Sequence, residues 1–284
     1  MDNKKFKTDD TVSEYFLGQR WGECTAVAGG VGCGKTVIAH MVSAYNINEH
    51  KEPTFAVLLE EANNKTVRNI KSKIDGLNYG DPMVYEMYRE KYMDTVTEMD
   101  DKLFLWDSKA PSSYRFDIEE IVAAIRYNYF EHGCRRVMLD NFTKLVYELD
   151  DPSTKNNFIT RWSGELCNLA AELDLTVMAF SHLNAPPEGK RSHEEGGGVL
   201  SKQMTGSRAI MRDFANILGF ERNTLAEGDD IHNSFLVPLK CRDYGAKPKI
   251  KTRYDENTTR LEEYEWDGDK LWEDKRKGSS RSGY

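Results

Sequence analysis

Residues 29 to 36 read GGVGCGKT: a glycine, four further residues, and then Gly-Lys-Thr. A short apolar run, CTAVA at 24–28, precedes this stretch, and an amphipathic segment, TVIAHMVSAY at 36–45, follows it. A strand, a glycine loop and a helix are the context in which this spacing forms a phosphate-binding loop. Backbone N–H groups of such a loop surround phosphate oxygens, and the helix N-terminus adds the positive end of its dipole. The stretch therefore predicts a site for ATP or another NTP or dNTP.

Every residue of this loop is expected to contact the nucleotide. Lys35 is predicted to reach the outer phosphates, and the hydroxyl of Thr36 to ligate Mg²⁺. Cys33 is either a reactive thiol or a small tolerated residue, and we favour the second interpretation. The predicted nucleotide-binding residues of the loop are Gly29, Gly30, Val31, Gly32, Cys33, Gly34, Lys35 and Thr36.

Length and composition limit the class of protein. The 284 residues, 39% of them hydrophobic, suffice for one large α/β domain or two small ones. No apolar run is long enough to span a bilayer, and the polar N-terminus has no signal peptide, so we expect a cytoplasmic protein without membrane association. Five cysteines without a C-x-x-C pair indicate a reducing compartment and no disulfide or zinc framework.

Strand-like and helix-like segments alternate along the chain. Strands are expected at 24–28, 54–59, 102–106, 136–139 and 175–180, and helices at 11–20, 36–45, 63–74, 82–99, 117–131 and 158–173. A helix at 207–214 and strands at 217–221, 234–240 and 249–254 follow, the last of them antiparallel. This alternation predicts an α/β fold with a mostly parallel central sheet flanked by helices.

Residues 184–206 interrupt the alternation with proline, glycine and charge. Long loops of this kind in compact domains are usually functional, and we expect this one to be mobile. Between Gly189 and Arg212 the chain has five cations against two carboxylates, although its net charge is −8. Such a segment suits the phosphate backbone of single-stranded DNA, and a solvated loop is an equal alternative. The candidate DNA-binding residues are Lys190, Arg191, Lys202 and Arg208.

Hydrolysis of a nucleotide needs a second magnesium ligand and a group that positions water. Asp140 ends the strand RRVMLD, where a Walker-B aspartate would lie. Glu60 and Glu61 end the strand predicted at 54–59, and either one of them polarises water or both form a solvated turn. His182 ends LTVMAFSH and is either a sensor of the terminal phosphate or a structural histidine.

Hydrolysis also needs a cation for the charge of the transition state. Lys240 and Arg242 flank Cys241, and strand alternation puts both on one face. They could act as an arginine finger that reaches the nucleotide of a neighbouring subunit. Alternatively, they are solvent-exposed residues of an edge strand.

Together these segments resemble the RecA-like motor domain of DnaB-type (superfamily 4) ring-shaped replicative helicases, and most closely the phage primase-helicase and Twinkle branch. The resemblance covers about residues 12–266. Beyond the phosphate loop, it rests on LLEE (58–61), VMLDNF (137–142), FSHLNAP (180–186), TGSRAIMRDFANILGFERN (205–223) and LKCRDYG (239–245). The primase part is expected to be missing, because the motor begins close to Met1.

The resemblance implies roles for single residues. It selects Glu60 as the catalytic glutamate and makes His182 the phosphate sensor. It assigns Lys240 and Arg242 to the site of the neighbouring subunit. It also implies that Arg222 and Tyr254 sandwich the nucleotide base.

The implied function is an ATP-dependent DNA helicase, in which a ring, expected to be a hexamer, moves 5′ to 3′ on single-stranded DNA and unwinds duplex DNA. Residues 1–20 would be a tail with an inter-subunit helix, 21–266 the ATPase domain, and 267–284 a disordered tail. A separate primase, polymerase or loader is a possible partner, and a phage-infected bacterium is the expected setting. The alternatives are a RecA- or RadA-like recombination ATPase forming filaments on DNA, and a KaiC-like or loader-type ATP switch acting on a protein.

Overall fold

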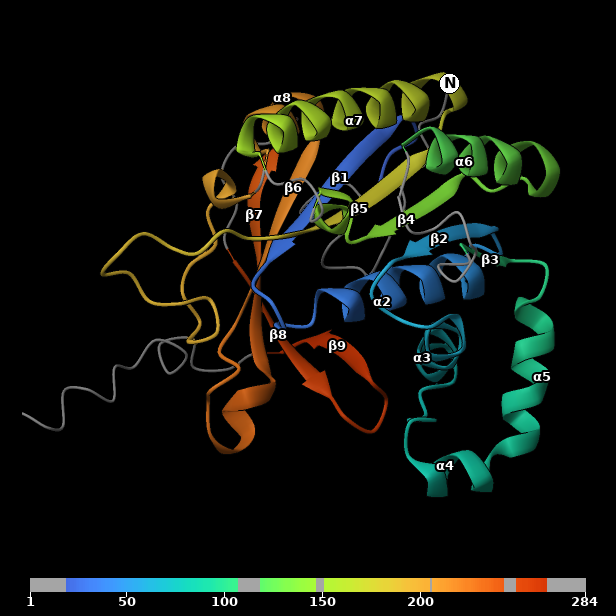
Figure 1. Cartoon of the computed structure of the whole chain (residues 1–284). Helices are drawn as coiled ribbons and strands as arrows, with labels where there is room; N and C mark the ends of the chain where they lie inside the picture. The colour runs from blue at the N-terminus through green and yellow to red at the C-terminus, as the bar shows by residue number, and fades with distance from the viewer. Residues whose placement is uncertain (1–18, 107–117, 147–150, 205, 243–248, 265–284) are drawn as a thin grey trace, which may run out of the picture.

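The computed structural model describes residues 19–106, 118–146, 151–204, 206–242 and 249–264, which form one nine-stranded sheet with helices on both faces (Figure 1). All but the last two residues of the helix predicted at 11–20 lie outside these residues, and so does the whole tail predicted at 267–284. Among the described residues, no helix is both long enough and apolar enough to cross a membrane.

The spatial order of the strands is β3-β2-β4-β5-β1-β6-β7-β8-β9. The strands are β1 (Glu23–Gly29), β2 (Thr54–Leu58), β3 (Leu103–Leu105), β4 (Arg136–Asp140), β5 (Thr176–His182), β6 (Asn216–Arg222), β7 (Asn233–Cys241), β8 (Ile250–Asp255) and β9 (Arg260–Glu263). The α-helices are α2 (Lys35–Asn48), α3 (Asn63–Asp75), α4 (Pro82–Met87), α5 (Arg89–Met99), α6 (Ile118–His132), α7 (Pro152–Leu173) and α8 (Ser207–Asp213).

The sheet has a parallel part and an antiparallel part. From β3 across to β6 every neighbouring pair is parallel, whereas β7, β8 and β9 each pair antiparallel to the strand before them. This confirms the predicted α/β class, with a mostly parallel sheet and antiparallel strands at its C-terminal end. Strand β9 was not predicted, because its four residues RLEE have no apolar alternation.

Strand alternation sends side chains into two separate cores. In β1, Val27 packs in the core beneath α2, while Ala26 and Ala28 face the core formed with α6, α7 and α8. Figure 1 shows these three helices along one face of the sheet and α2 and α3 on the other. Because both faces are covered, the parallel strands are almost continuously buried, as parallel sheets require.

Two helices differ from their predicted bounds. The single helix expected at 82–99 is two helices, α4 and α5, separated at Tyr88 with φ −115° and ψ 27°. None of the residues of α4 is buried, and its Tyr85 packs edge-on against Tyr92 of α5. Helix α7 begins at Pro152, six residues earlier than expected, because the Asp151 carboxylate accepts a hydrogen bond from the backbone N–H of Thr154 (2.7 Å) and caps it.

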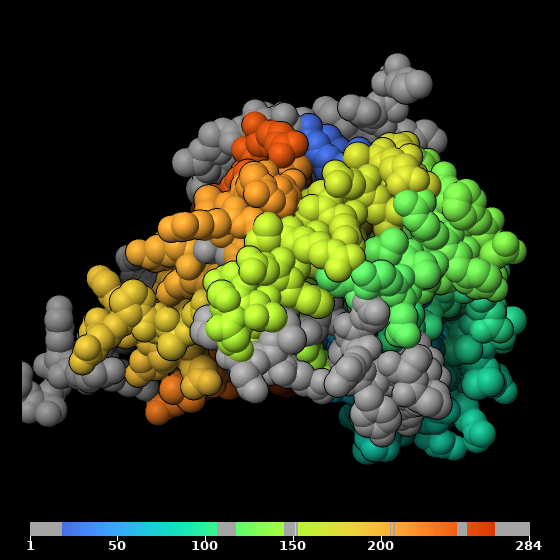
Figure 2. All heavy atoms as spheres, turned by 45° about the horizontal axis from the view of Figure 1, so that its top comes forward, coloured from blue at the N-terminus to red at the C-terminus, as the bar shows by residue number. Residues whose placement is uncertain are grey.

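The segment predicted to be a mobile loop is tied to the body of the protein. Leu183 bridges to Met204, and Glu195 bridges to Asn223 beyond the end of β6. Val199 and Met204 are buried in the core. Figure 2 shows that the gold-coloured part of the segment nevertheless stands out to one side of the helical layer formed by α6 and α7.

Candidate nucleotide site

The candidate site lies at the carboxyl edge of the parallel strands. Gly29, the last residue of β1, is paired with His182, the last residue of β5. Leu58, the last residue of β2, is paired with Asp140, the last residue of β4. Register therefore brings the phosphate loop, the glutamate turn after β2, Asp140 and His182 to one edge, where open α/β sheets bind ligands.

The phosphate loop ends in a helix N-terminus that is open to an anion. Gly34 has φ 105°, a left-handed conformation that favours glycine, and α2 begins directly after it at Lys35. No side chain caps this helix, and its first turn contains no acidic residue. The backbone N–H groups of the first turn have no intrahelical acceptors and therefore fit a phosphate group.

Lys35 is buried against the loop, with 4% of its surface exposed. Its Nζ donates to the carbonyl oxygens of Gly29 (3.0 Å) and Gly30 (2.7 Å) and also contacts His182 Nδ1 (3.1 Å). An ammonium group has no acceptor, so Nδ1 accepts and the neutral ring carries its proton on Nε2. That nitrogen faces Glu60 Oε1 at 3.3 Å, so Lys35, His182 and Glu60 form one chain of contacts.

Thr36 and Asp140, the predicted magnesium ligands, are in contact with each other. The Thr36 hydroxyl donates to Asp140 Oδ2 at 2.5 Å, and Asp140 is 3% exposed. Burial is the main reason that the pKa of Asp140 is raised to about 6. No cluster of three or more His, Cys, Asp or Glu among the described residues offers another metal site. Two oxygen donors beside a phosphate site fit Mg²⁺, which is typically bound through one or two protein ligands and substrate phosphates.

The structure distinguishes the two glutamates that the sequence left open. Glu61 is buried and bound by His40 Nε2 (2.5 Å) and the Thr66 hydroxyl (2.7 Å). Glu60 keeps 40% of its side chain exposed, and its hydrogen bond with His182 holds the pKa of the carboxyl below its usual value. Glu60 is therefore an ionised carboxylate at the open edge, while Glu61 fixes the turn that carries it.

Three residues that follow Asp140 support the site and were not predicted. Thr143 Oγ1 accepts from the backbone N–H of His182 (3.3 Å) and donates to Asn141 Oδ1 (2.7 Å). The Lys144 ammonium donates to the carbonyl oxygen of Leu59, just before the glutamate turn. These contacts fix the sensor histidine and the glutamate turn relative to Asp140. The only signal in the sequence was that they follow the strand-end aspartate directly.

Arg222 and Tyr254 lie beside the phosphate loop, as the base-binding prediction requires. Both line a small pocket that also includes Gly34, Val37 and Phe220. The guanidinium Nε of Arg222 donates to the carbonyl oxygen of Ile231 (2.8 Å), which fixes its direction.

Cys33 lines the same pocket and is 2% exposed. Burial raises the pKa of its thiol despite the nearby ammonium of Lys35. This favours the interpretation of Cys33 as a small tolerated residue over a reactive thiol.

Lys240 and Arg242 lie at the opposite edge of the sheet. Cys241, between them, is paired with Asn216 at the beginning of β6, and Asn216 is level with Thr25 in β1. Thr25 precedes Gly29 by four residues, or roughly 13 Å of strand. Neither cation is therefore near the phosphate loop of its own chain.

The two cations differ in what they contact. The Lys240 ammonium donates to the carbonyl oxygens of Met211 (2.5 Å) and Phe214 at the end of α8, and burial lowers its pKa. Arg242 is exposed. The resemblance assigns both cations to the site of a neighbouring subunit. The exposed Arg242 is compatible with that role, whereas the Lys240 ammonium is already hydrogen-bonded within its own chain.

The predicted DNA-binding residues are spread along the segment after β5. Lys190, Lys202 and Arg208 are exposed, and Arg191 is partly buried. Lys190 and Arg191 lie in its projecting part, Lys202 in a short 3-10 turn (Ser201–Gln203), and Arg208 in α8. The four residues therefore lie in three separate local structures of this segment.

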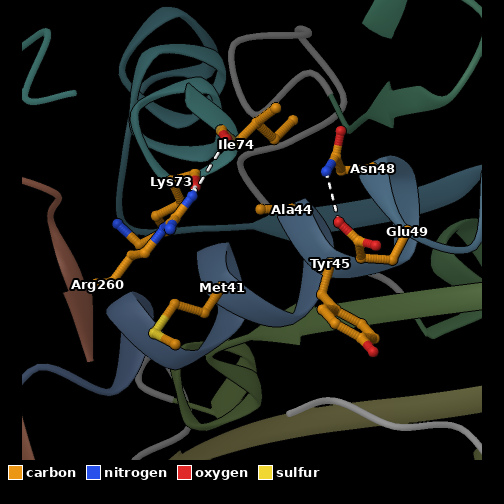
Figure 3. A pocket seen from close by; sticks show the side chains of 8 residues that line it. All are labelled: Met41, Ala44, Tyr45, Asn48, Glu49, Lys73, Ile74 and Arg260. Carbon is orange, nitrogen blue, oxygen red and sulfur yellow. Dashed lines mark hydrogen bonds between the residues drawn. The ribbon is translucent and has the colours of Figure 1, made fainter. Parts of the chain in front are cut away.

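A second hollow lies away from these residues (Figure 3). It is bounded by Met41, Tyr45 and Asn48 of α2, Ile74 of α3 and Arg260 of β9. None of the predicted nucleotide-site residues lines it, so it is not part of the candidate site.

Comparison with known proteins gives consistent results. The family model of the DnaB-like helicase C-terminal domain matches residues 8–263. The DNA helicase/primase of Enterobacteria phage T3 is 27% identical over 243 residues, which cover 81% of this chain and 40% of that protein. The chain thus spans well under half the length of this curated relative. The solved structure of another protein's ATPase domain superposes with a TM-score of 0.74 at 17% identity, covering 93% of each chain, which confirms the fold.

Proposed function

The chain belongs to the family of DnaB-like helicase C-terminal domains and is a helicase ATPase domain, and from this premise we propose that it is the motor of a replicative DNA helicase. In this proposal the chains assemble into a ring, a hexamer, that uses ATP and Mg²⁺ to move 5′ to 3′ on single-stranded DNA. The ring separates the strands of duplex DNA at a fork. The proposed setting is the cytoplasm of a phage-infected bacterium.

The observation that carries the proposal is the separation of the groups that hydrolysis needs. Lys35, Thr36, Asp140 and Glu60 meet at the carboxyl edge of the sheet. Arg222 also lies beside the phosphate loop there, and its Nε donates to the carbonyl oxygen of Ile231. The exposed Arg242 lies at the other edge. Head-to-tail association brings opposite edges of two copies together, and such interfaces generate rings when the rotation closes. This supports a site shared between neighbouring copies.

The residues of the carboxyl edge then act as follows. Bound ATP supplies the phosphoanhydride bond that is cleaved. Thr36 and Asp140 would hold Mg²⁺, which would neutralise charge on the phosphates. The Lys35 ammonium would donate to phosphate oxygens instead of to the carbonyl oxygens of Gly29 and Gly30. Glu60 orients water and accepts its proton, which an ionised carboxylate can do.

The remaining parts of the proposal concern partners and boundaries. Arg242 of a neighbouring copy stabilises charge in the transition state. The basic segment after β5 contacts DNA phosphates, an interaction that falls steeply with salt. Residues 21–266 form the motor, residues 1–20 contact a neighbouring copy, and 267–284 form a tail. A separate primase, polymerase or loader works with the ring.

Unwinding of a forked DNA duplex by this chain with ATP and Mg²⁺ tests the proposal. We expect strand separation by the wild type and none by Lys35→Ala, which loses the phosphate ligand but keeps the loop. If ATP is hydrolysed at the same rate with and without single-stranded DNA and no duplex opens, the helicase proposal is wrong. A switch that acts on a protein partner would then replace it.

A further inference from the structure

The basic segment after β5 touches the phosphate loop directly, through His193. A Cβ atom placed on Gly30 would lie 2.7 Å from the Cβ of His193, closer than side chains approach one another. Gly30 is not among the glycines with positive φ, so its backbone conformation does not demand glycine. Close contact with His193 is therefore a reason for glycine at position 30.

His193 also holds its own segment together. Its Nε2 faces the carbonyl oxygen of Asn184 (3.3 Å) and its Nδ1 faces that of Gly197 (3.4 Å). The turn it belongs to is closed by the N–H of Gly197 donating to the carbonyl oxygen of Ser192 (2.7 Å). A neutral imidazole donates to only one of these two carbonyl oxygens. The ring thus lies between the start of the segment, two residues after His182, and a compact turn at 192–197.

The far side of this turn is anchored on β6. The backbone N–H of Val199 donates to Glu221 Oε1 (2.8 Å), and Lys249 Nζ donates to Glu221 Oε2 (2.5 Å). Glu221 is buried, with 2% of its surface exposed. The turn is therefore held between the phosphate loop and β6, while Lys190 is exposed on the projecting side.

The contact between His193 and Gly30 lies beside the Lys35 ammonium, which is predicted to bind phosphate. The carbonyl oxygen of Gly30 accepts from Lys35 Nζ at 2.7 Å, and the same ammonium contacts His182. A phosphate that draws Lys35 away removes this restraint from Gly30 and from His182 together. His193 contacts Gly30 of the phosphate loop and also faces Asn184. It therefore connects the phosphate loop with the residues that follow His182.

We propose that His193 is a positioning residue that couples occupation of the phosphate loop to the conformation of the basic segment at 184–204. The inference rests on the proposed function, because the segment at 184–204 is the proposed DNA contact. Coupling of this kind is reciprocal in binding free energy, so DNA on Lys190 and Arg191 would change nucleotide affinity by the same factor.

Hydrogen–deuterium exchange of the segment tests this without DNA. The amide exchange of residues 184–204 is measured with and without a non-hydrolysable ATP analogue and Mg²⁺. In the wild type we expect the analogue to change exchange by about fivefold, the lower end of typical couplings. In His193→Ala, which lacks the imidazole, we expect less than half of that response at a saturating concentration of the analogue, which a parallel binding measurement verifies.

Two further variants separate coupling from a structural role. Glu194→Ala changes the exposed neighbour in the same turn and should respond as the wild type does. His193→Gln keeps a side-chain donor and should recover part of the response. A segment that responds fully in His193→Ala, or that ignores the bound analogue in the wild type, would overturn the inference. Failure of the helicase proposal would appear separately, as absence of unwinding.

Discussion

The two edges of the parallel sheet are built differently. At the carboxyl edge, buried groups contact one another: Lys35 meets His182, and Thr36 meets Asp140. At the amino edge, Lys240 is bound by α8, and the exposed Arg242 is the side chain left facing outward. A site shared between two copies requires ordered phosphate-binding residues on one edge and an exposed cation on the other. The following predictions test whether the site is shared in this way.

The largest effect is expected from Arg242→Ala. Loss of a trans-acting arginine should lower kcat by about 10³- to 10⁵-fold, because that cation stabilises transition-state charge. Nucleotide affinity of the isolated chain should change little, since Arg242 is remote from its own phosphate loop. The measurement is steady-state ATP hydrolysis beside nucleotide binding.

Mixing two inactive variants tests the division itself. Arg242→Ala and Glu60→Gln chains, each inactive alone, should regain part of the activity when they assemble together, because some interfaces then combine an intact Glu60 with an intact Arg242. Absence of any recovery in mixed assemblies would argue that both residues act within one chain.

Glu60→Gln is expected to have the next largest effect. Removal of a general base should lower kcat by about 10²- to 10⁴-fold while nucleotide binding is retained. Glu61→Gln is the matched control, because Glu61 is bound by His40 and Thr66 rather than facing the open edge. Equal losses of kcat in the two variants would contradict the distinction that the geometry draws between them.

Lys240→Met should act on stability. It removes two hydrogen bonds from an ammonium to the carbonyl oxygens of Met211 and Phe214, and hydrogen bonds to charged groups contribute ~1.5–3 kcal/mol each. Chemical denaturation should show this loss, and Arg242→Met should leave the free energy of unfolding within about 0.5 kcal/mol, as exposed positions do. Similar destabilisation by both would mean that the two cations are equivalent in the fold.

The smallest effect is a dependence of stability on pH. Burial lowers the pKa of His40, and the hydrogen bonds of Glu61 hold the pKa of that carboxyl below its usual value despite burial. Both groups bind fewer protons in the folded chain than in the unfolded chain. The stability that His40 contributes is therefore lost as pH falls below about 6.5, and that of Glu61 only as pH falls below about 4.5. Denaturation midpoints should therefore fall on acidification, and less so in His40→Gln. A steeper fall in that variant would contradict the assignment.

The sequence predicted much of the site because strand ends are visible in it. Asp140 and His182 each close a buried apolar run, and parallel strands that share a sheet bring such ends to one edge. It did not predict Thr143, Lys144 or Glu221, whose partners lie 39, 85 and 22 residues away along the chain. Contacts over such separations follow from strand order and not from a local pattern.

What the sequence alone determined was the phosphate loop, the α/β alternation and the chemical types that stand at the strand ends, because spacing and apolar periodicity are local properties. Only the tertiary structure decided which glutamate is open, which cation is already bound, and that His193 rests on Gly30. Glu60 and Glu61 are adjacent in the chain, and only packing against His40 and Thr66 distinguishes them. Lys240 and Arg242 are two residues apart in the chain, and only the carbonyl oxygens at the end of α8 distinguish the buried contacts of Lys240 from the exposed Arg242.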